Sequence, residues 1–178
     1  MIVAHVAITA ADDYLTRRES HRQAHLERIV ALRARGFCLA GGPAPDGRTA
    51  DLLYRVEQPG DVTRLVEEDP YFTGGVWTAY RVRSFSRFLE PWEQPPVVID
   101  GSRRATLVEG LATDVEMASF ALIEARGAGR MAFGGFFPDG DALALMRASD
   151  PDEAMASLAE SGLWKPETLH ARPFLHVL

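Results

Sequence analysis

His25 and Asp69 are the side chains of this chain best suited to acid/base chemistry. His25, Ile29 and Leu32 recur at the spacing of one helix face, so the imidazole shares the stripe that faces the predicted sheet. Arg22 lies one turn earlier on that stripe. Because an imidazole titrates near neutrality, a carboxylate beside it would fix its tautomer and let it transfer protons. Asp69, at the end of a second predicted helix over the same sheet face, is the candidate partner.

The same residues also have structural explanations. A helical histidine with an arginine one turn away is often a partly buried residue bonded to a backbone carbonyl, and an aspartate before a proline commonly starts a turn. His21 precedes His25 by four residues, a spacing that can chelate a metal, but the sequence offers no third ligand, so we predict no metal site. Cys38 is the only cysteine and is interpreted as a small core residue, which excludes an internal disulfide.

Apolar periodicity predicts the order β-α-β-β-α-β for residues 1–90, which is the ferredoxin-like order. Asp12 or Asp13 is the expected N-cap of the first helix, and Gly36 is the glycine expected to close it. Pro45-Asp46-Gly47 predicts the turn of a hairpin. The expected elements are strands over 2–8, 37–41, 50–56 and 76–85, a long helix up to about residue 35, and a short helix that stops at Pro70.

The chain contains an internal repeat. The glycine-rich segment 41–47 returns at 134–140, an offset of 93 residues, and we expect this register to hold without a gap to the C-terminus. At this offset Ala118 replaces His25 and Gly162 replaces Asp69, so we expect one working site, in the first half. The second copy is expected to have strands over 104–110, 131–135, 143–148 and 169–177, with helices over 113–126 and from Asp150 onward.

Polar residues alternate along the final predicted strand of each copy. Trp77, Arg81 and Arg83 share one predicted face, and His170, Arg172 and His176 share a face in the second copy. This pattern indicates either the wall of an amphipathic pocket suited to a carboxylate or phenolate, or a solvated edge.

Composition limits the possible partners. The chain has 178 residues, of which 47% are hydrophobic, and a net charge of −6, so it can form a core but has no basic stripe to neutralise nucleic-acid phosphates. No stretch approaches the length of a membrane span, and the first residues lack a basic region followed by an apolar run. We therefore expect a cytoplasmic protein that has no nucleic-acid or membrane partner.

Four motifs in the first half resemble the YCII-related (YciI-like) proteins of the dimeric α+β barrel superfamily. The motifs are Arg22-x-x-His25-Leu26, Ala40-Gly41-Gly42-Pro43, Asp69-Pro70-Tyr71, and the strand from Gly75-Val76-Trp77 to Arg83-Ser84-Phe85. The resemblance covers about residues 1–90, and the second half resembles the superfamily only through the repeat. The chain departs from the family pattern in the additional glycine of Gly41-Gly42 and in the missing tryptophan of Arg83-Ser84-Phe85.

The resemblance and the repeat together imply a fold class. We expect an α+β protein of two tandem ferredoxin-like (βαββαβ) units, packed sheet to sheet as an intramolecular dimeric α+β barrel. The units would span 1–90 and 103–178, joined by a proline-rich linker over 91–102. The second sheet would cover the open face and the edges of the first. The chain would then be a monomeric pseudo-dimer or part of a higher homo-oligomer.

The resemblance also implies a function. Family members are small cofactor-free proteins in which a His and an Asp are the proposed acid/base pair, and related proteins eliminate, isomerise or oxidise small aromatic or lactone-like metabolites. We therefore expect a cofactor-independent isomerase, lyase or dehydratase that acts on a small anionic or aromatic metabolite without a metal. The alternatives are a cofactor-free monooxygenase and a non-catalytic accessory protein that binds a small ligand. The expected catalytic residues are His25 and Asp69, and the expected substrate-binding residues are Arg22, Tyr71, Trp77 and Gly42.

Overall fold

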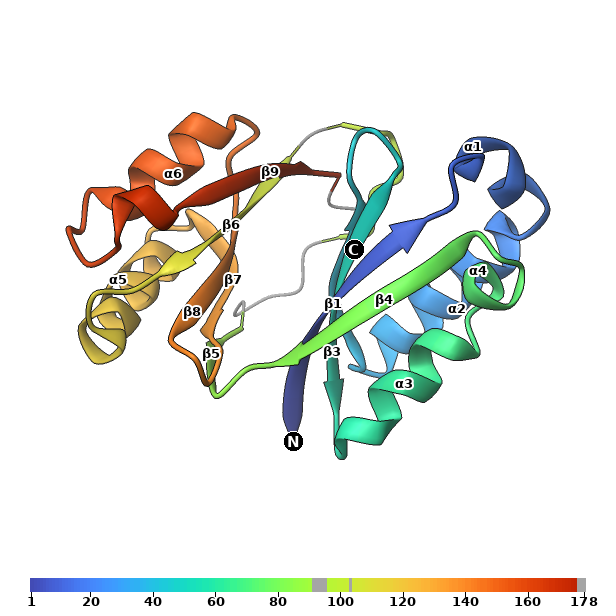
Figure 1. Ribbon diagram of the computed structural model, residues 1–178, viewed down its shortest axis with the longest axis horizontal. Helices are drawn as coiled ribbons and strands as arrows, with labels where there is room; N and C mark the ends of the chain where they lie inside the picture. Colours follow the sequence, from blue (N-terminus) through green and yellow to red (C-terminus); the bar gives the residue numbers. More distant parts are fainter. Residues whose placement is uncertain (91–95, 103, 176–178) are drawn as a thin grey trace. The chain divides into compact units, whose positions relative to one another are not determined.

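The computed structural model describes residues 1–90, 96–102 and 104–175, and the chain divides into two compact units (Figure 1). Residues 1–84 form the body of the first unit and residues 104–175 that of the second. The sequence prediction placed residues 85–90 with the first half, whereas the structure includes them in the second unit. Residues 91–95 of the predicted linker lie outside the described residues.

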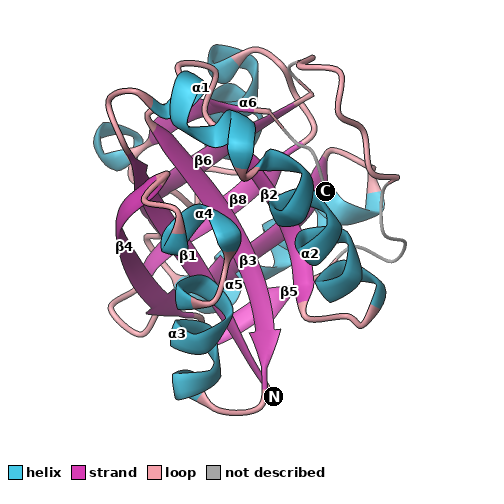
Figure 2. Ribbon diagram, turned by 90° about the vertical axis from the view of Figure 1, so that its right-hand side faces the viewer, coloured by secondary structure: helices cyan, strands magenta, loops and turns pink. Residues whose placement is uncertain are grey.

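The first unit follows the predicted order of strands and helices, with one helix broken and one short helix added. Its elements are β1 (Ile2–Ala10), α1 (Tyr14–Arg17), the 3₁₀ helix η1 (Arg18–Ser20), α2 (Arg22–Ala34), β2 (Cys38–Pro43), β3 (Thr49–Val56), α3 (Pro59–Glu67), α4 (Pro70–Thr73) and β4 (Trp77–Ser84). The four strands form an antiparallel sheet in the order β2-β3-β1-β4. Helices α2, α3 and α4 lie over one face of this sheet (Figure 2).

The core of the first unit lies between these helices and the sheet. Alternate residues of β1 and β3, such as Val6 and Tyr54, are fully buried in this layer, and Ile29 of α2 and Val66 of α3 pack with them. The alternation of a strand and the repeat of a helix bring these side chains to one interface. Burying each large aliphatic side chain contributes about 2 kcal/mol, so this layer holds α2 and α4 in fixed positions over the sheet.

The long first helix predicted from Asp12 or Asp13 is interrupted at His21. Helices α1 and α2 are separated by η1, and the Asp13 side chain does not cap α1. It forms two hydrogen bonds to Arg17 instead, at 2.9 and 3.0 Å. Gly36 follows the end of α2 with φ of 78°, as expected of a closing glycine. Tyr14 of α1 meets Tyr71 of α4 edge to face, with ring centroids 6.2 Å apart.

The second unit repeats this order and adds a strand. Its elements are β5 (Arg87–Leu89), β6 (Ala105–Leu111), α5 (Val115–Gly127), β7 (Met131–Phe136), β8 (Asp141–Met146), α6 (Pro151–Ala159), the 3₁₀ helix η2 (Pro166–Thr168) and β9 (His170–Phe174). The strands form an antiparallel sheet in the order β5-β7-β8-β6-β9, so β5 extends the ferredoxin-like sheet by one strand. Across the described residues of both units, no helix is long and apolar enough to cross a membrane.

The offset between the two copies changes by one residue at the hairpin turn, contrary to the prediction that it holds without a gap. Gly42 pairs with Asp51 and the corresponding Gly135 pairs with Leu143, so the offset of 93 before the turn becomes 92 after it. The later helices keep this new offset, since α3 begins at residue 59 and α6 at residue 151. The residue that corresponds to Asp69 is therefore Ser161 rather than Gly162. Helices α2 and α5 precede the change, begin at residues 22 and 115, and have 13 residues each, so Ala118 still corresponds to His25.

Candidate active site

The structure brings His25 and Asp69 together, although they are 44 residues apart in the chain. His25 Nδ1 lies 2.8 Å from Asp69 Oδ1. The Asp69 carboxylate is fully buried, and the His25 side chain retains 13% of its exposure. The second ring nitrogen, Nε2, makes no hydrogen bond to any described residue, so it is the atom of the pair open to a small molecule.

Asp69 is held in place because it is the N-cap of α4. Its backbone is extended, with φ of −69° and ψ of 137°, and Pro70 occupies the first helical position. Asp69 Oδ1 also accepts a hydrogen bond of 2.8 Å from the Tyr71 N–H. One carboxylate oxygen therefore receives both the cap bond and the bond from His25.

The other carboxylate oxygen faces Arg28, which the sequence analysis did not single out. Arg28 Nε lies 3.9 Å from Asp69 Oδ2, and neither atom has a hydrogen-bond partner among the described residues. The Arg28 guanidinium also donates to the Leu65 carbonyl at 3.4 Å and to Glu68 Oε2 at 3.3 Å. The spacing of Arg28, three residues after His25, was the available signal, because residues three apart share a helix face.

Two aromatic rings fix the plane of the His25 imidazole. The Tyr71 ring stacks on it with centroids 3.8 Å apart and an interplanar angle of 10°. The Trp77 ring meets it edge to face at 5.2 Å and 80°. Tyr71 and Trp77 each retain only 4% of their exposure. Both predicted substrate-binding aromatics therefore contact His25, and their faces are largely covered by protein.

Two arginines place positive charge beside this cluster. The Arg18 guanidinium lies 5.1 Å from the centroid of the Tyr14 ring and donates a long hydrogen bond of 3.5 Å to its hydroxyl. Burial raises the pKa of Tyr71 well above its usual value, Tyr14 adds to the rise, and the Arg18 and Arg22 guanidiniums oppose it. Tyr71 therefore stays a neutral phenol, and Arg22, one turn before His25, lies within electrostatic reach of it.

Gly42, the remaining predicted substrate-binding residue, is not brought to this cluster. It lies on β2, where it pairs with Asp51. Strand β2 is one edge of the first sheet, and β4, which carries Trp77, is the other edge. The sequence could not show this separation, because it depends on the order of the strands.

The structure corrects the predicted face shared by Trp77, Arg81 and Arg83. Trp77 pairs with Ala10 but Ala79 pairs with Thr9, which marks a register shift at the start of β4. This bulge turns Trp77 toward the helices, where it joins the core with Tyr71. His176, part of the corresponding prediction for the second copy, lies outside the described residues.

A second His–Asp pair lies on the opposite face of the first sheet. His5 Nε2 is 2.6 Å from Asp51 Oδ1, and the side chains retain 1% and 6% of their exposure. Leu53 is the direct partner of His5 across β1 and β3, so Asp51 is its diagonal neighbour. Sequence reasoning missed Asp51; a carboxylate within an otherwise apolar strand was the available signal.

A metal site finds no support in the described residues. They contain no group of three or more His, Cys, Asp or Glu side chains that could hold a metal ion. His21 lies against Gly74, where an added Cβ would come within 2.5 Å of the imidazole. The His21 ring thus fills a space that a glycine leaves open.

Comparison with known proteins places the first half of the chain in a family. Residues 1–86 match the sequence model of the YCII-related domain. The first unit is a YCII-related domain. The His25–Asp69 pair, its aromatic neighbours and both arginines all belong to this YCII-related unit. No curated protein matches the chain.

Several solved structures are similar to the chain over both units. A candidate monooxygenase from Lactobacillus acidophilus NCFM is 11% identical with a TM-score of 0.62, and the match covers 99% of this chain and 94% of that one. A candidate monooxygenase from Fusobacterium nucleatum subsp. nucleatum is 7% identical with a TM-score of 0.60, over 99% and 92%. A heme-binding protein from Thermus thermophilus is 9% identical with a TM-score of 0.56, over 98% and 91%.

At these identities the likeness shows the fold alone. It confirms the predicted fold class, α+β with two antiparallel sheets of the dimeric α+β barrel type. The sheet-to-sheet packing of the two units stays a prediction.

Proposed function

We propose that the YCII-related unit is a cofactor-independent acid/base catalyst, in which His25 transfers protons and Asp69 orients its imidazole. The observation that carries this proposal is the 2.8 Å contact between His25 Nδ1 and Oδ1 of a fully buried carboxylate. Because an ionised carboxylate accepts hydrogen bonds and cannot donate, it holds the proton of the neutral ring on Nδ1. The lone pair of the ring is then on Nε2, and Nε2 is the base.

Proton transfer through Nε2 accounts for the proposed reaction types. Nε2 takes a proton from an acidic C–H group of the substrate, and the imidazolium that forms is stabilised by Asp69. Returning this proton to a different carbon gives an isomerisation. Giving it to a leaving group gives an elimination, as in a lyase or dehydratase. Both outcomes balance without an oxidant or reductant.

A small anionic or aromatic metabolite is the substrate class that the surroundings of His25 favour. Arg22 is the proposed anchor for a carboxylate or phenolate, since it lies one turn before His25 on the same helix. Tyr71 and Trp77 are proposed to act through the imidazole, because their rings contact it and are themselves buried. They are therefore positioning residues, which keep Nε2 aimed at the bound substrate.

Substitution of His25 by Asn tests the proposal. The Asn amide can still donate to Asp69 Oδ1 from the place of Nδ1, but it has no atom in the place of Nε2. The assay is solvent-deuterium incorporation or elimination, followed by NMR over a panel of small aromatic acids and lactones. We expect His25→Asn to lower the rate by about 10²-fold or more, the usual contribution of a general base. His21→Asn, four residues earlier and outside the pair, is the matched control and should keep the rate.

Each remaining outcome separates the proposal from an alternative. A wild-type chain that binds members of the panel but turns none over would be a ligand-binding protein. Oxygen consumption with an oxidised product would indicate the monooxygenase. Full activity of His25→Asn would remove the imidazole from the mechanism altogether.

A further inference from the structure

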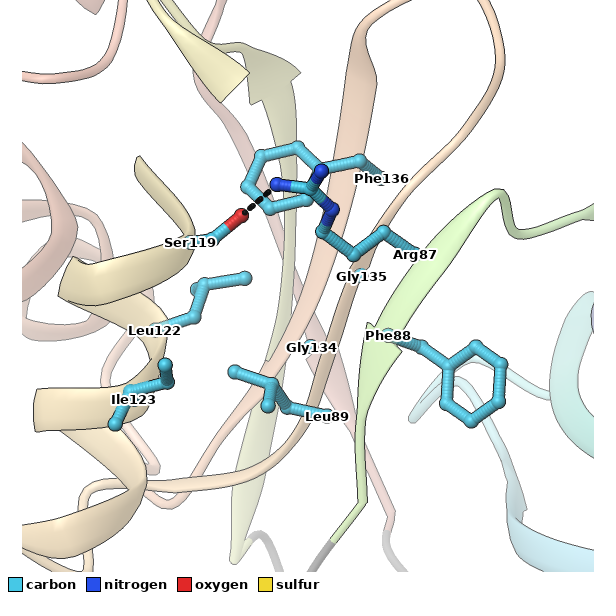
Figure 3. Close-up of a pocket in the computed structure, with 9 residues that line it drawn as sticks. All are labelled: Arg87, Phe88, Leu89, Ser119, Leu122, Ile123, Gly134, Gly135 and Phe136. Atoms are coloured by element: carbon cyan, nitrogen blue, oxygen red, sulfur yellow. Dashed lines mark hydrogen bonds between the residues drawn. The ribbon is translucent and has the colours of Figure 1, made fainter. Parts of the chain in front are cut away.

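The second unit contains a pocket where the additional strand β5 extends the sheet beyond helix α5. Helix α5 covers β7, and β5 lies on the far side of β7 at the edge of the sheet. The first unit has no strand in this position, because β2, the counterpart of β7, is itself an edge. A cavity of about 110 Å³ remains between the helix and the added strand. Figure 3 shows this pocket between α5, β7 and β5.

The wall of the pocket is apolar. Leu122 and Ile123 line it from α5, Leu89 lines it from β5, and Phe136 lines it from β7. Gly134 supplies bare backbone on the β7 side, and a Cβ there would come within 3.1 Å of Leu122. This space is smaller than the cavity of about 150 Å³ that accommodates benzene, so it would hold a short alkyl chain or part of an aromatic ring.

One cation stands at the end of this apolar space. Arg87 extends from β5 toward α5, and its Nη1 donates a hydrogen bond of 3.2 Å to Ser119 Oγ (Figure 3). The Ser119 hydroxyl donates in turn to the Val115 carbonyl at 2.7 Å, so the serine is committed to holding the arginine. Glu116 Oε1 lies 3.6 Å from Arg87 Nη2, but both side chains are largely exposed, at 82% and 49%. An exposed ion pair of this kind is weak and easily exchanged for another carboxylate.

We infer that this pocket binds a small monocarboxylate with an apolar body, such as an aromatic or short-chain acid. The ring or chain would lie against Leu122 and Ile123. The carboxylate would replace Glu116 on Arg87, whose Nε and Nη2 present two parallel donors on the edge that Ser119 leaves open. No acidic side chain lines the pocket among the described residues, so its charge favours an anion. This site is separate from the His25–Asp69 pair, and it does not depend on the function proposed for that pair.

Titration of the full-length chain with benzoate, followed by NMR of its backbone amides, tests this inference. We expect saturable shifts at Leu122, Ile123 and Gly134 on titration to about 10 mM. Benzamide, which has the same shape without the charge, should bind about tenfold more weakly. Arg87→Gln should weaken the binding of benzoate to a similar extent. Arg87→Gln should leave any reaction of the first unit unchanged.

Arg130→Gln is the matched control. Arg130 is 49% exposed like Arg87, and it also contacts a serine and a glutamate, at 3.4 and 4.0 Å, but it does not line the pocket. Its variant should bind benzoate as the wild type does. Three results would each overturn the inference. They are equal affinity for benzoate and benzamide, an equal loss of benzoate affinity in both arginine variants, and shifts confined to the first unit. The lack of a saturable shift would do so as well.

Discussion

Removing the Asp69 side chain should destabilise the folded chain far more than neutralising it. Asp69 Oδ1 accepts from the Tyr71 N–H and from His25 Nδ1, each at 2.8 Å. Asp69→Ala removes the N-cap bond from the Tyr71 N–H, worth about 1 kcal/mol, and leaves His25 Nδ1 without its acceptor, which costs about 2 kcal/mol more. We expect a total loss of about 3 kcal/mol in the free energy of unfolding.

Asp69→Asn keeps an oxygen in the place of Oδ1, so both donors stay satisfied. The oxygen that it exchanges for an amide nitrogen, Oδ2, makes no hydrogen bond to a described residue, but it lies 3.9 Å from Arg28 Nε, so the exchange loses this electrostatic attraction. We therefore expect the free energy of unfolding of Asp69→Asn to lie within about 1 kcal/mol of the wild-type value. Activity should fall in both variants, because each removes the charge that stabilises the His25 imidazolium.

Equilibrium unfolding in urea, followed by circular dichroism, measures these differences. Asp114→Ala is the control for the cap alone, since Asp114 caps α5 by accepting from the N–H groups of Glu116 and Met117 and supports no histidine. It should cost about 1 kcal/mol. Similar stability of Asp69→Ala and Asp114→Ala would mean that the bond to His25 contributes nothing. An Asp69→Asn variant as unstable as Asp69→Ala would show that the charge, rather than the acceptor, supports the fold.

Further measurements address other parts of the chain. Burial raises the pKa of Cys38 from 9.0 to about 12, so the unfolded chain loses this proton at a lower pH than the folded chain does. The free energy of unfolding should therefore fall above pH 9 by about 1.4 kcal/mol per pH unit. Cys38→Ala should remove this contribution, which urea titrations at different pH would measure. Asp51→Ala should cost about 3 kcal/mol in thermal unfolding by breaking a buried pair, and the double change of His5 and Asp51 to Leu and Val should recover much of it. Gly75→Ala should lower stability by about 1 kcal/mol because φ is +67°, whereas Gly60→Ala in α3, with nothing within 4 Å of the new Cβ, should not. A loss in Gly60→Ala equal to that in Gly75→Ala would refute the backbone explanation.

The pairing of His25 with Asp69 was predictable from sequence because it depends on local patterns and on element order. The helical spacing placed His25 on the sheet-facing stripe, and Pro70 predicted a break after Asp69. In a β-α-β-β-α-β unit both helices cover the same face, so these two signals sufficed to bring the side chains near each other. The distance of 2.8 Å needed the structure.

The features that sequence could not supply depend on registers between distant strands. The bulge that turns Trp77 away from Arg81 is visible only in the pairing of β4 with β1. The pairing of β5 with β7 joins segments that share no pattern. The one-residue change between the copies lies in a turn, where the local sequence tolerates either length. Because α3 and α6 keep the new offset, this one-residue error moved the predicted counterpart of Asp69 from Ser161 to Gly162.

The corrected counterpart, Ser161, separates the two roles of Asp69. Ser161 Oγ accepts from the N–H of Leu163, two residues later, as Asp69 Oδ1 accepts from that of Tyr71. The second copy thus keeps the turn after its helix with a hydroxyl, and the turn does not need a carboxylate. In the first copy the charged oxygen additionally meets His25, and in the second the buried Ala118 stands in the place of His25. The second copy therefore keeps the turn but lacks both the imidazole and the carboxylate. This is the pattern expected if these two groups act as a functional pair.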